Sequence, residues 1–148
     1  MKGLSFVFKG FFQKKRPTLP DSWAVGHLGA ERTAFLRINT PLKDRAYQGG
    51  LPVSTVFTVP MSELGGEADL PAAFEDALFA ELQDAGLGVV AAVVTREATR
   101  EFITYTADSS IGAKLLGRLR AKFPNLEVSV SSQLDADWQL FHSLLPKA

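Results

Sequence analysis

The chain contains no cysteine among its 148 residues. This absence excludes disulfide bonds, thiolate nucleophiles and the cysteine-ligated zinc and iron–sulfur sites. Histidine is nearly as scarce, since only His27 and His142 are present, whereas a metal site usually takes three or four ligands. We interpret both histidines as surface or packing residues, and we predict neither a metal site nor a cofactor. The lack of cysteine also suits the reducing cytoplasm, which is the location we expect.

The glycine-rich and serine motifs of common enzymes are missing too. The two Gly-Gly pairs, at residues 49–50 and 65–66, have neither the following lysine nor the strand-to-helix setting of a phosphate-binding loop. No Gly-x-Ser-x-Gly sequence is present, which argues against a hydrolase of that class. Asp135 and Asp137 could act as paired carboxylates in acid–base chemistry or cation binding, but carboxylates at the start of a predicted helix more often cap it. The sequence therefore predicts a protein that is not an enzyme.

Long apolar runs and a one-sided charge are absent as well. The longest apolar stretches, such as residues 88–94, fall far short of the roughly 20 residues that span a bilayer. The 16 basic and 16 acidic residues cancel, and five of the basic ones lie in residues 1–20, which hold no acid. The rest of the chain is mildly acidic, which argues against nucleic acid as a partner because phosphate contacts need clustered Lys and Arg. Apolar residues make up 46% of the chain and charged residues 22%, and with this length they predict one globular domain.

The first 20 residues form a separate segment with the pattern of a basic amphipathic helix. Over residues 1–12 the apolar side chains recur with helical spacing, and three basic residues and two prolines follow. This pattern predicts either an interfacial membrane anchor or a tail that frays or docks onto its own domain, residues 21–148. As an anchor it would place the protein at the inner membrane surface, with membrane-facing residues Leu4, Phe8, Phe11, Phe12, Lys14, Lys15 and Arg16.

Residues 21–148 alternate between strand and helix patterns. Period-2 alternation and stretches rich in Val, Thr and Phe predict strands, and apolar stripes at helical spacing predict helices. Strands are predicted at residues 23–29, 33–40, 51–59, 88–95, 100–107 and 126–132. Helices are predicted at residues 71–85, about 109–123 and 136–145, the last two capped by Asp108 to Ser110 and by Asp135.

The order of these elements predicts an α+β fold. From residue 51 it is strand, helix, strand, strand, helix, strand, which is the split βαβ or ferredoxin-like plan (βαββαβ). In this plan an antiparallel sheet has both helices on one face because the crossovers are right-handed. We expect a β-hairpin to precede this unit and a short C-terminal helix to follow it, covering an edge or the open face of the sheet.

A polar pocket is one candidate site. Arg37 and Asn39 alternate on one face of the second predicted strand, and Arg100, Glu101 and Tyr105 lie on a later strand. If the two strands are neighbours, an Arg–Glu pair and a tyrosine hydroxyl could line a shallow pocket for a small ligand. Structural ion pairing is the alternative.

Two further features could contact a ligand or a partner. Trp138, which follows Asp137 on the last predicted helix, is either a stacking platform for a ligand or a hydrophobic plug. The charged residues 95–101, between two predicted strands, form either a contact surface or a solvated turn with weak ion pairs.

Short motifs spread from residue 21 to residue 146 carry a resemblance to a known family. They are Asp21-Ser22-Trp23, Leu36-Arg37-Ile38-Asn39, Val93-Val94-Thr95, Arg100-Glu101-Phe102 with Tyr105-Thr106, Asp135-Ala136-Asp137-Trp138 and Leu145-Pro146. In these motifs the chain resembles the bacterial family numbered 695 in the domain-of-unknown-function series, which has no established activity. The resemblance implies a fold distantly similar to the ferredoxin-like protein regulators of the bacterial endoribonuclease that degrades mRNA, and those regulators act by protein–protein contact.

These observations favour a non-catalytic interaction or regulatory domain whose partner is another protein. Two alternatives stay open: a small-ligand-binding domain with a polar pocket near Arg37 and Tyr105, and a peripheral membrane protein anchored by residues 1–16. The residues predicted to bind a ligand or partner are Arg37, Asn39, Arg100, Glu101, Tyr105, Asp137 and Trp138.

Overall fold

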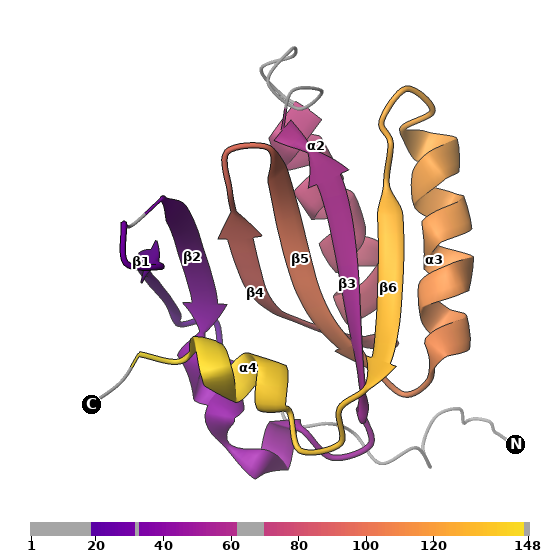
Figure 1. Ribbon diagram of the computed structural model, residues 1–148. Helices are drawn as coiled ribbons and strands as arrows, with labels where there is room; N and C mark the ends of the chain where they lie inside the picture. Colours follow the sequence, from indigo (N-terminus) through magenta and orange to yellow (C-terminus); the bar gives the residue numbers. More distant parts are fainter. Residues whose placement is uncertain (1–18, 32, 62–69, 147–148) are drawn as a thin grey trace, which may run out of the picture.

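A six-stranded antiparallel sheet organises the chain, with its strands in the order β1-β2-β4-β5-β3-β6 (Figure 1). The computed structural model describes residues 19–31, 33–61 and 70–146. The strands are β1 (Trp23–Leu28), β2 (Ala34–Asn39), β3 (Val53–Pro60), β4 (Gly88–Thr95), β5 (Thr99–Thr106) and β6 (Ser129–Leu134). The helical elements are η1 (Thr40–Lys43), η2 (Arg45–Tyr47), α2 (Leu70–Leu78), its π-helical continuation η3 (Phe79–Asp84), α3 (Ser109–Lys122) and α4 (Gln139–Leu144). The α+β class predicted from the sequence is confirmed.

Strand β4 lies inside the sheet between β2 and β5, and all but the last of its residues are buried. Its unbroken apolar sequence is typical of a strand that is covered on both faces. Between Val90 and Ala92 the register with β5 shifts by one residue, so Ala91 is the extra residue of a β-bulge. As a result, Val90 and Val93 both pack on the same side of the sheet although they are three residues apart.

Helices α2 and α3 cover one face of the sheet, which is the far face in Figure 1. Their apolar stripes meet Phe57, Phe102 and other strand residues in a buried cluster. At Gly112 of α3 an added Cβ would lie only 2.8 Å from the Thr55 methyl group, so glycine allows the helix to approach the sheet closely. The cluster comprises Phe57, Val59, Phe74, Leu78, Leu82, Val90, Val93, Phe102, Leu115, Leu119, Leu126 and Val128.

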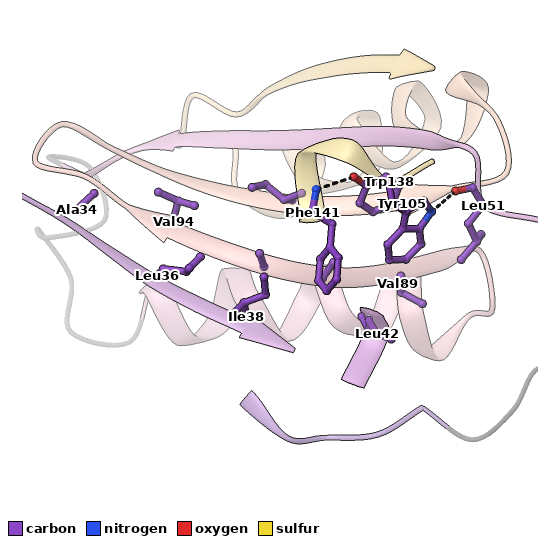
Figure 2. Packing of buried hydrophobic residues seen from close by; sticks show 13 residues of the cluster. Ala34, Leu36, Ile38, Leu42, Leu51, Val89, Val94, Tyr105, Trp138 and Phe141 are labelled. Carbon is purple, nitrogen blue, oxygen red and sulfur yellow. Dashed lines mark hydrogen bonds between the residues drawn. The ribbon is translucent and has the colours of Figure 1, made fainter. Parts of the chain in front are cut away.

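Helix α4 and the turn η1 cover part of the opposite face, as Figure 2 shows for the residues packed beneath them. Because α4 has only six residues, it shields one region of this face and leaves the rest of β3, β5 and β6 to form a groove beside it. The buried cluster here comprises Ala34, Leu36, Ile38, Leu42, Leu51, Val89, Ala91, Ala92, Val94, Ile103, Tyr105, Trp138 and Phe141.

The predicted elements agree with the observed ones to within three residues at every boundary, and the two largest differences have local causes. β6 begins at Ser129, because the Val128 carbonyl accepts hydrogen bonds from the Arg120 guanidinium (Nε 3.2 Å, Nη2 3.0 Å) in place of a strand partner. α4 begins at Gln139, because Trp138 adopts a left-handed backbone conformation with φ 57° and cannot be part of the helix.

The predicted amphipathic helix at residues 1–12, the basic residues 14–16 and the turn at residues 63–69 lie outside the described residues. All seven residues predicted to face a membrane belong to this group, so the membrane-anchor hypothesis stays a prediction. Among the helices that the structure describes, none is long and apolar enough to cross a bilayer.

Candidate functional site

The five residues of the predicted polar pocket lie on two different faces of the sheet. Arg37 of β2 is paired with Val93 of β4, whose side chain packs beneath the helices, and it forms an ion pair with a residue of α2. Arg100 also lies near Arg37, so both arginines belong to the helix-covered face. Glu101 and Tyr105 belong to the face that carries α4. The structure therefore does not bring these side chains into one pocket.

Arg37 is held against helix α2 by a two-pronged ion pair with Glu75. Its Nη2 and Nη1 atoms donate hydrogen bonds of 2.5 Å and 3.2 Å to the two carboxylate oxygens. Arg100 donates from Nε to the Thr95 hydroxyl at 3.0 Å. Burial lowers the pKa of Arg100, and the charge of Arg37 lowers it further, whereas Glu75 opposes both effects. Within the described part of the chain, both guanidinium groups thus lie near the single carboxylate of Glu75, and these three side chains together carry one net positive charge.

Asn39 joins the segment before β1 to the end of β2. Its amide nitrogen donates to the Pro20 carbonyl at 2.8 Å, and its side-chain oxygen accepts from the Ser22 amide at 3.3 Å. The residue is buried, with both polar atoms satisfied by the backbone. Asn39 therefore has a structural role in this arrangement.

Tyr105 and Trp138 form a stacked aromatic pair in the core under α4 (Figure 2). Their ring centroids are 3.9 Å apart with an interplanar angle of 10°, and both residues are fully buried. The Trp138 indole N–H donates to the Leu51 carbonyl at 2.9 Å. The Tyr105 hydroxyl donates to Asp135 Oδ2 at 2.7 Å and accepts from the Phe141 amide at 3.1 Å. Neither ring is open to a ligand. Of the two roles considered for Trp138, its burial therefore fits a hydrophobic plug and not a stacking platform for a ligand.

Asp135 organises the start of α4. Its two carboxylate oxygens accept from the Gln139 amide at 2.8 Å and the Leu140 amide at 3.0 Å, although it lies four residues before the helix. Partial desolvation tends to raise the pKa of Asp135, but the hydrogen bonds from Tyr105 and from these two amides outweigh it, so the pKa lies below its ordinary value. Burial, followed by the hydrogen bond to Asp135, raises the pKa of Tyr105. This carboxylate therefore anchors a helix and a tyrosine.

Asp137 does not join Asp135 in a hydrogen-bonded carboxylate pair. It is exposed, and within the described part of the chain it makes no hydrogen bond or ion pair. The two histidines also lie in different contexts: the His27 ring packs on Phe35 at 4.7 Å, and His142 lies 3.4 Å from the Gln48 amide nitrogen. In residues 19–31, 33–61 and 70–146 no three His, Asp or Glu side chains are arranged to hold a metal ion.

An exposed apolar surface, which the site prediction missed, lies on the β1–β2 hairpin. Val25 is 74% exposed and Phe35 is 55% exposed, and they share the helix-side face of the hairpin with His27 and Arg37. We refer to these four residues as the hairpin face. The period-2 alternation of β2, which places Phe35 on the same side as Arg37, is the sequence signal that could have identified it.

The structure defines a small α+β domain whose polar candidate residues are divided between the two faces of one sheet. The chain belongs to a family of unknown function, DUF695, whose family model matches residues 22–145. This match confirms the resemblance that the short motifs predicted. No curated protein and no solved structure matches the chain significantly.

Proposed function

We propose that this protein is a non-catalytic interaction domain that binds another protein through the hairpin face. The observation that carries the proposal is the exposure of Val25 and Phe35, side by side with a positively charged residue. Single exposed apolar residues are common, but a valine at 74% and a phenylalanine at 55% lie here at diagonal positions on the same face of a two-stranded hairpin, where one partner can cover both. Burial of this apolar surface against a partner removes it from water and thereby lowers the free energy of the complex.

The composition and order of the hairpin face also support protein binding. Aromatic residues and arginine are enriched in the binding surfaces of proteins and among the residues that contribute most of their affinity. Arg37 is already held by Glu75, and Phe35 is packed on His27, so these side chains lose little conformational freedom when a partner binds. A preordered surface of this kind favours binding.

The charge next to the hairpin face selects the kind of partner. Among the described residues, the carboxylate that acts on both Arg37 and Arg100 is that of Glu75. A partner segment that presents a carboxylate beside an apolar side chain would complement both the charge and the exposed surface. The partner that we infer is therefore an acidic protein segment.

The topology supports the proposal that β3 to β6 form a ferredoxin-like unit. The strand order β4-β5-β3-β6 with α2 and α3 on one face is the arrangement expected for a split βαβ plan. In this interpretation the β1–β2 hairpin is an addition to the unit, and the binding surface lies on the addition. Because fold similarity alone does not carry function, the proposal depends on the hairpin face and not on any likeness to the endoribonuclease regulators.

Site-specific photo-crosslinking in the native cells tests this function. A photoreactive amino acid is introduced separately at Val25, at Phe35 and, as a matched control, at the exposed Lys114 of α3. We expect one adduct of the same mass from the two hairpin positions and none from Lys114. The substitution Val25→Glu, made in the protein that carries the photoreactive residue at position 35, adds a negative charge to an acidic interface and should abolish the adduct. Equal crosslinking from Lys114, or no adduct from either hairpin position, would refute the proposal.

A further inference from the structure

A groove lies on the opposite face of the sheet, beside α4. It has a volume of about 330 Å³ and is bounded by α4, by strands β3, β5 and β6, and by the β4–β5 turn. We call it the α4 groove. A volume near the lower end of the ~300–1,000 Å³ typical of ligand pockets restricts the groove to a small molecule.

One end of the α4 groove is apolar. Val56 and Ile103 are cross-strand partners on its floor, and Leu140 and Leu144 of α4 form a wall. Leu140 is one of the few large apolar side chains that stay exposed in the described residues. An apolar side chain of a ligand would cover this surface and remove it from water.

The other end of the groove carries one positive and one negative group. Arg96 Nε lies 3.5 Å from Glu101 Oε1, with the two side chains 51% and 30% exposed. This single contact uses one N–H of a guanidinium that has five and one oxygen of a carboxylate that has two. Exposed ion pairs of this kind are weak, so each partner can accept a second charged group at little cost.

Two hydroxyl groups lie on the floor between these ends. Thr58 pairs with Glu101 across β3 and β5, and Ser131 pairs with Val56 across β6 and β3. Neither hydroxyl makes a hydrogen bond to another described residue, and both can donate or accept. They are free to contact the polar part of a ligand.

We propose that the α4 groove binds a small zwitterion with an apolar side chain, of the class of the free apolar α-amino acids. The carboxylate of the ligand pairs with Arg96, its ammonium group with Glu101, and its side chain lies against Ile103 and Leu140. Both charged side chains at the polar end of the groove are needed for this arrangement, since an acid or an amine alone would pair with only one of them. The proposal is independent of the hairpin face, which lies on the other face of the sheet.

The test is an NMR titration of the full chain with ¹⁵N labelling. Leucine is the probe, and isovaleric acid, isoamylamine and glycine each lack one of its three binding groups. We expect saturable shifts of the Thr58, Glu101 and Ile103 amides with leucine and affinities about tenfold weaker or worse with the other three molecules.

Two variants and a matched control complete the test. Arg96→Gln and Glu101→Gln each remove one charge, from an exposed and a half-buried side chain respectively, and should weaken leucine binding about tenfold. Glu97→Gln removes a charge from the same turn outside the groove and should leave binding unchanged. Absence of saturable shifts, equal binding of isovaleric acid, or equal losses in the Glu97→Gln control would each overturn the proposal. None of these results would affect the crosslinking experiment on the hairpin face.

Discussion

Replacing Tyr105 by phenylalanine removes one oxygen atom that joins strand β5 to helix α4. The hydroxyl donates to Asp135 at 2.7 Å and accepts from the Phe141 amide at 3.1 Å, while the ring stacks on Trp138. The substitution leaves the ring, its burial and the stacking geometry in place. Its effect on stability therefore reports the two hydrogen bonds.

The expected loss follows from the nature of each bond. A hydrogen bond to a charged group contributes about 1.5–3 kcal/mol, and a buried donor without a partner costs about 1–3 kcal/mol. Asp135 is close to solvent and can recover water as a partner, so we expect a total near the lower limits, about 2–4 kcal/mol. With a urea m-value of about 2 kcal/mol/M, the unfolding midpoint of Tyr105→Phe should fall by about 1–2 M.

Urea unfolding followed by tryptophan fluorescence measures this change, since Trp138 lies against the substituted ring. Tyr47→Phe is the matched control, because Tyr47 is half-buried and its hydroxyl has no hydrogen-bond partner among the described residues. The raised pKa of Tyr105 adds a second readout: the wild-type protein should lose stability as the pH rises above about 10, and the Tyr105→Phe protein should lose less. A midpoint equal to that of the Tyr47→Phe protein would show that the reasoning about the network is wrong.

Further predictions concern the stability of the fold when two of its glycines are replaced by alanine and when the pH is lowered. Gly88→Ala should destabilise the fold by about 1–3 kcal/mol in thermal or urea unfolding, because its Cβ would collide with the Tyr105 carbonyl oxygen. Gly117→Ala, at an exposed position of α3 with open space around it, should instead stabilise by about 0.5–1 kcal/mol, and a loss there would contradict the steric argument. The pKa of Asp135 is below its ordinary value of 3.8, so its contribution is present above that pH and is lost as the pH falls through the folded-state pKa. Unfolding free energies measured from pH 6 to pH 2 should consequently decline less steeply for Asp135→Asn than for the wild-type protein, and identical slopes would refute this assignment.

The secondary structure was predictable because its signals are local. β4 has an uninterrupted apolar sequence, and α3 begins after Asp108, whose side chain accepts from the Ser110 amide at 2.9 Å. Each of these signals depends on residues that are neighbours in sequence. The elements therefore lie close to their expected places.

The polar site was less predictable, because it depended on the register between distant strands. Alternation showed that Arg37 and Asn39 share a face of β2, but it could not show which residues of β5 share that face. Which residues of β5 share the face of Arg37 depends on the pairing of β2 with β4 and of β4 with β5, including the bulge at Ala91. Tyr105 faces α4 for this reason, and its partner Asp135 comes from a segment 30 residues away.

The exposure of the hairpin face depends on how far the helices extend over the β1–β2 hairpin, which the alternation of residues along a strand does not reveal. The alternation of β2 is enough to put Phe35 on the same face as Arg37, but the length and position of the helices decide whether a helix covers that face. Helix α2 and its continuation η3 reach the hairpin at Trp23, whose ring lies 6.3 Å from that of Phe79, and at Arg37. Beyond these contacts Val25 stays open to solvent.

Because Ala91 is the extra residue of a bulge, strand β4 could lose this one residue without changing its pairing with β5. If Ala91 were deleted, Val90 would be followed directly by Ala92, and every other side chain of β4 would keep the face it now has. Homologues one residue shorter at this point could thus adopt the same architecture. A one-residue alignment gap at this position would therefore indicate a β4 strand without the bulge, and not a different fold.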